Sequence, residues 1–231
     1  WTSALTLLGT MDAPPRLVVV GASLLAAGGM ALWYRRFRLP FAMFLLGLAV
    51  LTGVYGLTGS IESLFPILDG PGAALFDLRA SPAFSLATLL FGIGAFVAGM
   101  WFDTRDPYRL GRHAATAFWL HMLAAPALVN TVAMTLYNIG GTAGMIATTG
   151  ALVLIAALAL VIDRRSFLTA GIVYIALVIG WAIRGGGADG FGHWIAMLLI
   201  LGALITALGT WWVPLRAGLM RALPDFPGKS R

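Results

Sequence analysis

Long apolar segments, separated by short charged or glycine- and proline-rich breaks, make up most of this chain. Each is about long enough to cross the roughly 30 Å hydrocarbon core of a bilayer as an α-helix. They lack the alternation of apolar and polar residues expected of barrel strands, and helices are the remaining way to satisfy the backbone in lipid. The pattern predicts an all-α polytopic transmembrane helical bundle, one transmembrane domain over residues 1–231. Its seven spans are Leu17–Tyr34, Pro40–Ser60, Ala83–Phe102, Ala114–Tyr137, Ala143–Ile162, Phe167–Ile183 and His193–Val213.

Composition agrees with lipid as the solvent for most of the chain. Of 231 residues, 60% are hydrophobic and 10% are charged, against roughly 25% charged in soluble domains. The net charge of +6 does not indicate nucleic-acid binding, because the basic residues sit in short clusters between apolar segments. The absence of cysteine excludes disulfides, thiol catalysis and cysteine-ligated metals.

The basic residues also predict an orientation. If the N-terminus lies outside, Arg16, Arg79 and Arg184 are the only basic residues on the outer side, and the other basic residues all fall inside. Such an excess is the usual sign of the inner side of a membrane protein. Trp33 and Trp101 fall at predicted inner ends, where tryptophan rings favour the interface. We therefore expect an outer N-terminus and an inner C-terminus.

The segments outside the spans are read as follows. Residues Trp1–Thr10 look like the end of a preceding apolar segment or an interfacial strip rather than a signal peptide. Ile61–Pro82 is expected to be an ordered outer cap or a re-entrant segment, and the glycine-rich Arg184–Gly192 a flexible outer turn. Residues 214–231 form a basic tail on the inner surface, either a weak amphipathic helix or an irregular segment.

His121 is the one ionisable side chain that the pattern places well within a span. It lies about 12 Å of helical rise from the charged start of its segment, and an intramembrane ionisable residue is by default a candidate site. One reading is a proton or substrate site; the other is a histidine bonded to the backbone or a hydroxyl of a neighbouring helix. His113 and His193 lie at other depths, so no metal site and no catalytic residue are expected.

Three further residues of the predicted span Ala114–Tyr137 are candidates for the same site as His121. Pro126 removes a helical hydrogen bond near His121 and is expected to kink the helix. By the 3.6-residue period, Trp119, Pro126 and Asn130 fall near one face and His121 on another. A kinked polar span is typical of transporter cavities, and also of inert bundles that use the kink for packing. With His121 they make up the candidate substrate or proton site.

The loop Asp103–His113 is the most densely charged part of the chain. Its aspartates and arginines can pair with each other, and Asp106 followed by Pro107 predicts the start of the next helix. That gives a turn locked by internal charge pairs. The functional alternative is contact with lipid headgroups or a partner, through Arg105, Arg109 and Arg112.

Outer acids and small residues are interpreted structurally. Glu62, Asp69 and Asp77 form an acidic outer lip that could gather cations, although solvated loop acids are the normal case. The small-residue spacings Ala95–Gly99 and Gly140–Gly144 are expected to let helices approach closely.

Several of these motifs together resemble a family of uncharacterised bacterial multi-pass membrane proteins. The resemblance rests on Asp-x-Arg-Asp-Pro-x-Arg at 103–109, Phe-Trp-Leu-His at 118–121, Leu-Ala-Ala-Pro at 123–126, Asp-Arg-Arg at 163–165 and Trp-Trp-x-Pro-Leu-Arg at 211–216. It covers places in the second half of the chain and implies a multi-pass protein of the bacterial inner membrane. It implies no activity, and it draws attention to His121 and Pro126.

Three functions remain open from the sequence, of which an intramembrane enzyme ranks third. The first is a non-enzymatic integral membrane subunit or accessory protein that packs against other membrane components, since few ionisable residues lie within spans. The alternative is a small-solute or proton-linked transporter centred on His121 and Pro126. The expected partners are the lipid bilayer and either a membrane-protein partner or further copies of this chain, with no nucleic acid. No cofactor can be assigned.

Overall fold

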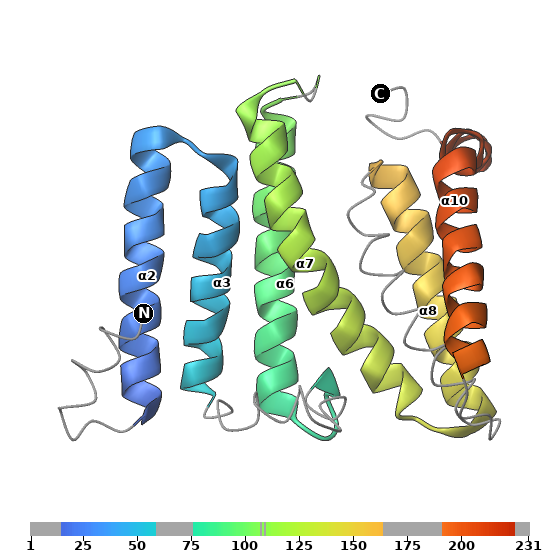
Figure 1. Ribbon diagram of the computed structural model, residues 1–231, viewed down its shortest axis with the longest axis horizontal. Helices are drawn as coiled ribbons and strands as arrows, with labels where there is room; N and C mark the ends of the chain where they lie inside the picture. The colour runs from blue at the N-terminus through green and yellow to red at the C-terminus, as the bar shows by residue number, and fades with distance from the viewer. Residues whose placement is uncertain (1–14, 59–75, 107, 109, 164–190, 225–231) are drawn as a thin grey trace. The chain divides into compact units, whose positions relative to one another are not determined.

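The computed structural model describes residues 15–58, 76–106, 108, 110–163 and 191–224 (Figure 1). The described part of the chain is helical and contains no strand. Five of its helices are long and apolar enough to cross a membrane, so the all-α, membrane-protein prediction is supported at that level. The helices are α2 (Pro15–Phe37), α3 (Pro40–Leu57), α6 (Pro82–Thr104), α7 (Arg112–Tyr137), α8 (Gly141–Ile162) and α10 (Phe191–Ala222).

The helix boundaries follow the predicted segments closely, with two exceptions. The predicted span Phe167–Ile183 lies outside the described residues. The last predicted span was expected to end at Val213, whereas α10 continues through Pro214 to Ala222. Within this continuation, Arg216 Nε donates to the Leu160 carbonyl at 3.2 Å, and just before it Trp212 Nε1 donates to Asp163 Oδ1 at 3.0 Å.

The chain divides into two compact units, residues 1–148 and 149–231. In unit 1, α2 packs on α3, α3 on α7 and α6, and α6 on α7. Consecutive helices of this unit run in alternating directions, so the α2–α3 turn and the α6–α7 turn lie at one end (Figure 1). We call this the arginine end, because it carries the exposed Arg35, Arg36, Arg38, Arg105 and Arg112.

α7 is the most buried helix of unit 1, and glycines on its neighbours make this packing close. A Cβ at Gly92 of α6 would lie 3.0 Å from the Ala127 Cβ of α7, and one at Gly99 would lie 2.8 Å from His121 Cε1. The close approach predicted for the Ala95–Gly99 spacing is confirmed at Gly99. A Cβ at Gly144 of α8 would lie 2.9 Å from the Tyr137 carbonyl oxygen at the end of α7. Gly144 thus allows the two helices to approach closely at their tight turn.

Several buried hydroxyl groups inside unit 1 bond to one another or to their own helix. The Tyr55 hydroxyl of α3 lies 3.0 Å from Thr88 Oγ1 of α6, and Thr88 Oγ1 in turn donates to the Phe84 carbonyl at 2.8 Å. The Tyr55 ring stacks on Phe84 with 4.2 Å between centroids. A hydroxyl buried with its partner in place joins two helices without leaving a polar group unsatisfied.

The end opposite the arginine end is held by Asp77, which is 4% exposed. Its Oδ2 accepts from the Asn138 side-chain amide at 2.9 Å, and its Oδ1 from the Arg79 backbone N–H at 2.9 Å. Asp77 is therefore neither a solvated loop acid nor part of a cation-gathering lip, so that interpretation is wrong for this residue. Glu62 and Asp69 lie outside the described residues.

We expect Asp77→Ala to lower the free energy of unfolding by roughly 1.5–3 kcal/mol, because two hydrogen bonds to a buried carboxylate are lost. The midpoint of unfolding by increasing SDS mole fraction in mixed micelles measures this. Arg79→Ala is the matched control, because its backbone N–H still donates to Asp77. Equal destabilisation by both variants would contradict the role given to the carboxylate.

Candidate functional site: the His121 and Asp103 pair

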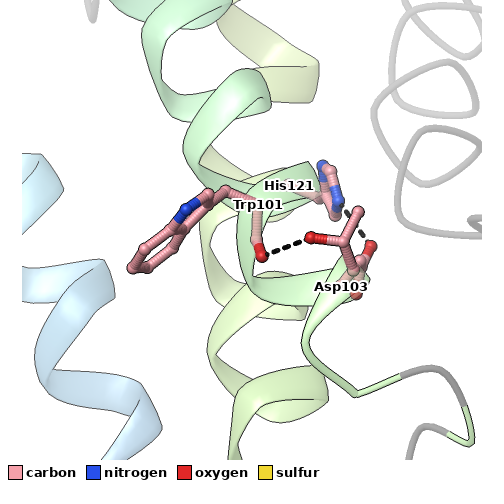
Figure 2. A network of polar contacts seen from close by, with 4 residues as sticks. Trp101, Asp103 and His121 are labelled. Atoms are coloured by element: carbon pink, nitrogen blue, oxygen red, sulfur yellow. Dashed lines mark hydrogen bonds and ion pairs between the residues drawn. The ribbon is translucent and has the colours of Figure 1, made fainter.

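His121 is fully buried, with 0% of its surface exposed, on the face of α7 that packs against α6. Its Nε2 lies 3.1 Å from Oδ2 of Asp103, the penultimate residue of α6. The Asp103 side chain is 11% exposed. Figure 2 shows the imidazole facing the Asp103 carboxylate, whereas Trp101 points away on the other side of α6. Two ionisable side chains from consecutive helices thus meet inside the bundle.

The direction of side chains in antiparallel helices brings this pair together. A helical Cα–Cβ bond tilts toward the N-terminus of its own helix. The His121 side chain therefore leans toward the arginine end, where α7 starts, and the Asp103 side chain leans away from that end, along α6. Gly99 lies one turn before Asp103 on the same face of α6 and leaves room for the imidazole. The Phe96 ring, 5.4 Å from the imidazole centroid, closes the next turn.

The contact gives one polar atom of each side chain a hydrogen-bond partner, in an interior where burial alone is costly. An unpaired charge or polar group in a lipid-level interior is strongly unfavourable. When Asp103 is ionised, the Nε2–H group of His121 donates a hydrogen bond to it, whether the ring is neutral or protonated. This hydrogen bond fixes the orientation of the ring. Chemically, such a pair can take up and release a proton. The described residues hold no group of three or more histidine, cysteine, aspartate or glutamate side chains that could bind a metal ion.

The other residues of the candidate substrate or proton site lie away from His121. Pro126 is exposed and Asn130 is half-buried. α7 is a continuous helix through Pro126. The Trp119 ring packs on Phe41 and Phe44 of α3, at centroid distances of 4.8 and 5.3 Å. Trp119 thus serves the α3–α7 contact.

The charged loop uses its aspartates differently from the local pairing that was expected. Asp106 Oδ2 accepts from the backbone N–H of Gly111 at 2.7 Å and of Ala114 at 3.3 Å. Asp106 thus caps α7 from outside the helix. α7 begins at Arg112 with Gly111 at the N-cap position, five residues after the start at Pro107 that the sequence predicted. A carboxylate at a helix N-terminus satisfies free amides and opposes the positive end of the dipole.

Two of the three arginines proposed for headgroup or partner contact are described, and both are exposed. The Arg105 guanidinium lies over the Trp101 ring, 3.5 Å from its centroid, in a cation–π arrangement. Arg112 is the first residue of α7. Arg109 lies outside the described residues.

Asp103 is the residue of this site that sequence reasoning missed. It was assigned to the loop because an apolar run ends at Phe102, and its pairing partners were sought among the arginines. Two signals were nevertheless present: Asp103 lies one turn after Gly99, and the position of a helix end is uncertain by a residue or two. Comparisons with protein-family models, curated proteins and solved structures found no match to this chain.

We expect Gly99→Ala to displace the His121 ring and lower the unfolding free energy by roughly 1–3 kcal/mol, because the added methyl group would overlap the imidazole. Gly94→Ala is the control, since a Cβ there meets nothing within 4 Å and alanine favours a helix by about 1 kcal/mol over glycine. SDS titration in mixed micelles measures both. An unchanged midpoint for Gly99→Ala would contradict the close contact with His121.

Proposed function

We propose that this protein is a non-enzymatic integral membrane subunit or accessory protein that packs against other membrane components. The observation that carries the proposal is the burial of His121 and its bond to Asp103 of the neighbouring helix. The ionisable residue that most suggested a transport site is bonded through its Nε2 to a side chain of the neighbouring helix. A bacterial inner-membrane location, with the N-terminus outside and seven spans, belongs to the same proposal.

The outer helix of unit 1 supports this proposal. α2 contacts α3, but only 6% of its most apolar window is buried inside the structure, against 56% for α7. Leu24, Leu25 and Leu32 are each at least 68% exposed. A helix with this little internal burial presents its apolar surface to lipid or to another membrane protein, as an accessory subunit requires.

A proton-linked transporter is the second candidate, and the specific observation in its favour is the same pair of ionisable groups. An imidazole bonded to a carboxylate inside a membrane protein is a common element of proton relays. In this case the pair would load and release a proton during each transport cycle.

A tagged copy expressed at its native level and extracted in mild detergent tests the first proposal. We expect a complex larger than the 24.4 kDa chain in its micelle, containing one membrane-protein partner in fixed stoichiometry across independent preparations. His121→Ala and Asp77→Ala should both reduce the amount of folded protein, and the partner-to-protein ratio should remain the same in what folds.

Liposomes that contain the purified protein and a pH-sensitive dye test the second proposal. Under an imposed potential we expect proton entry equal to that of empty liposomes. Entry that exceeds this background, is lost in His121→Ala and survives in Asp77→Ala, together with recovery of the protein free of partners, would overturn the accessory function in favour of transport. Asp77→Ala is the matched control because it weakens the opposite end of unit 1 and leaves the pair intact.

A further inference from the structure

The arginine end of unit 1 carries positive charge that no described carboxylate neutralises. Among the described residues, no carboxylate lies within ion-pair distance of its five exposed arginines. The two acids of the adjacent loop are engaged elsewhere: Asp103 bonds to His121 and Asp106 to the amides at the start of α7. The sequence suggested a turn locked by its own charge pairs, and the structure instead leaves Arg105 and Arg112 to face outward.

Helix stability does not account for Arg112. It is the first residue of α7, whose first turn contains no acidic residue. A cation at a helix N-terminus is opposed by the helix dipole. Arg35 and Arg36, by contrast, lie in the last turn of α2, where the dipole favours them.

Exposed tryptophans place these arginines at the depth of lipid headgroups. Trp33 and Trp101 are each 49% exposed, and tryptophans at the ends of membrane helices favour the interface between hydrocarbon and headgroups. Trp101 lies directly beneath the Arg105 guanidinium. Trp33 lies two residues before Arg35.

The two turns form one surface rather than two separate charged sites. The Tyr34 hydroxyl at the end of α2 lies 3.4 Å from Thr116 Oγ1 of α7. The Tyr34 ring also meets Phe102 of α6 edge-on, with 6.3 Å between centroids. These contacts hold the arginines of both turns at the same end of one packed unit (Figure 1).

We propose that the arginine end binds the phosphate groups of anionic phospholipids, with Arg105 and Arg112 at the centre of the site. Guanidinium groups suit this ligand because their forked donors match the oxygens of a phosphate. The acyl chains of the same lipid would lie along the apolar helix surfaces below. This inference is independent of the proposed accessory function, since a transporter or a subunit can hold such lipids.

Native mass spectrometry of the delipidated full chain, titrated with phosphatidylglycerol or phosphatidylcholine, tests the proposal. We expect preferential binding of phosphatidylglycerol. Each basic residue near an anionic lipid contributes about fivefold in affinity, so the double variant Arg105→Gln, Arg112→Gln should bind it about 25-fold more weakly. The single variants should each lose about fivefold, which keeps the test valid if the double variant does not fold.

The matched control is the double variant Arg16→Gln, Arg79→Gln, which removes two exposed arginines of unit 1 away from the arginine end. It should bind phosphatidylglycerol as the unaltered chain does. Equal losses in the two double variants, or equal binding of phosphatidylcholine, would overturn the proposal. Displacement of phosphatidylglycerol by millimolar inorganic phosphate would also overturn it, by showing a site for a soluble anion.

Discussion

A histidine buried among membrane helices has to be given a partner, and much of unit 1 follows from this constraint. Leaving such a group without one costs several kcal/mol, by the magnitudes known for buried polar and charged groups. Here the partner comes from the helix that precedes it, so α6 must extend as far as Asp103 and pack with Gly99 against the imidazole. The polar contact thus helps to set the register of the α6–α7 hairpin, beside the close packing of Gly92 on Ala127.

The other described carboxylates are also bonded within the fold. Each of the four described aspartates bonds within the fold: Asp77 to Asn138, Asp103 to His121, Asp106 to the start of α7 and Asp163 to Trp212. The arginines of the arginine end are exposed, and none of them pairs with these acids. The described carboxylates thus bond to groups inside the fold or at helix ends, whereas the arginines of the arginine end face lipid or water. Among the described residues, the exposed charge is therefore more strongly basic than the net charge of +6 alone indicates.

Helix positions could be predicted from sequence because segment length and hydropathy follow directly from the thickness of a bilayer. The predicted span Ala83–Phe102 differs from α6 by one residue at its start and two at its end. Because Asp103 is one of the two residues at the end of α6 that the prediction left out, the partner of His121 could not be identified from the sequence. Side-chain pairing between helices depends on register and on the lean of the Cα–Cβ bonds, neither of which a hydropathy pattern contains. The sequence predicted Asp106 as a cap, but at the wrong helix position, for a similar reason. Its carboxylate accepts from the backbone N–H of Gly111, five positions later, and so caps a helix that starts further along the chain.

The surroundings of the His121–Asp103 pair bear on whether the pair stabilises the fold or transfers protons. His121 has no exposed surface, so a proton arriving from the arginine end meets Asp103 first, at 11% exposure. Further along α7, away from that end, Ala124, Ala125 and Val129 are each fully buried. The buried Thr131 hydroxyl beyond them donates to the carbonyl of Ala127 in its own helix. Transport requires that a bound proton reach both sides of the membrane in turn. These side chains beyond the pair are apolar or bonded within their own helix, an arrangement that supports the structural role proposed for the pair.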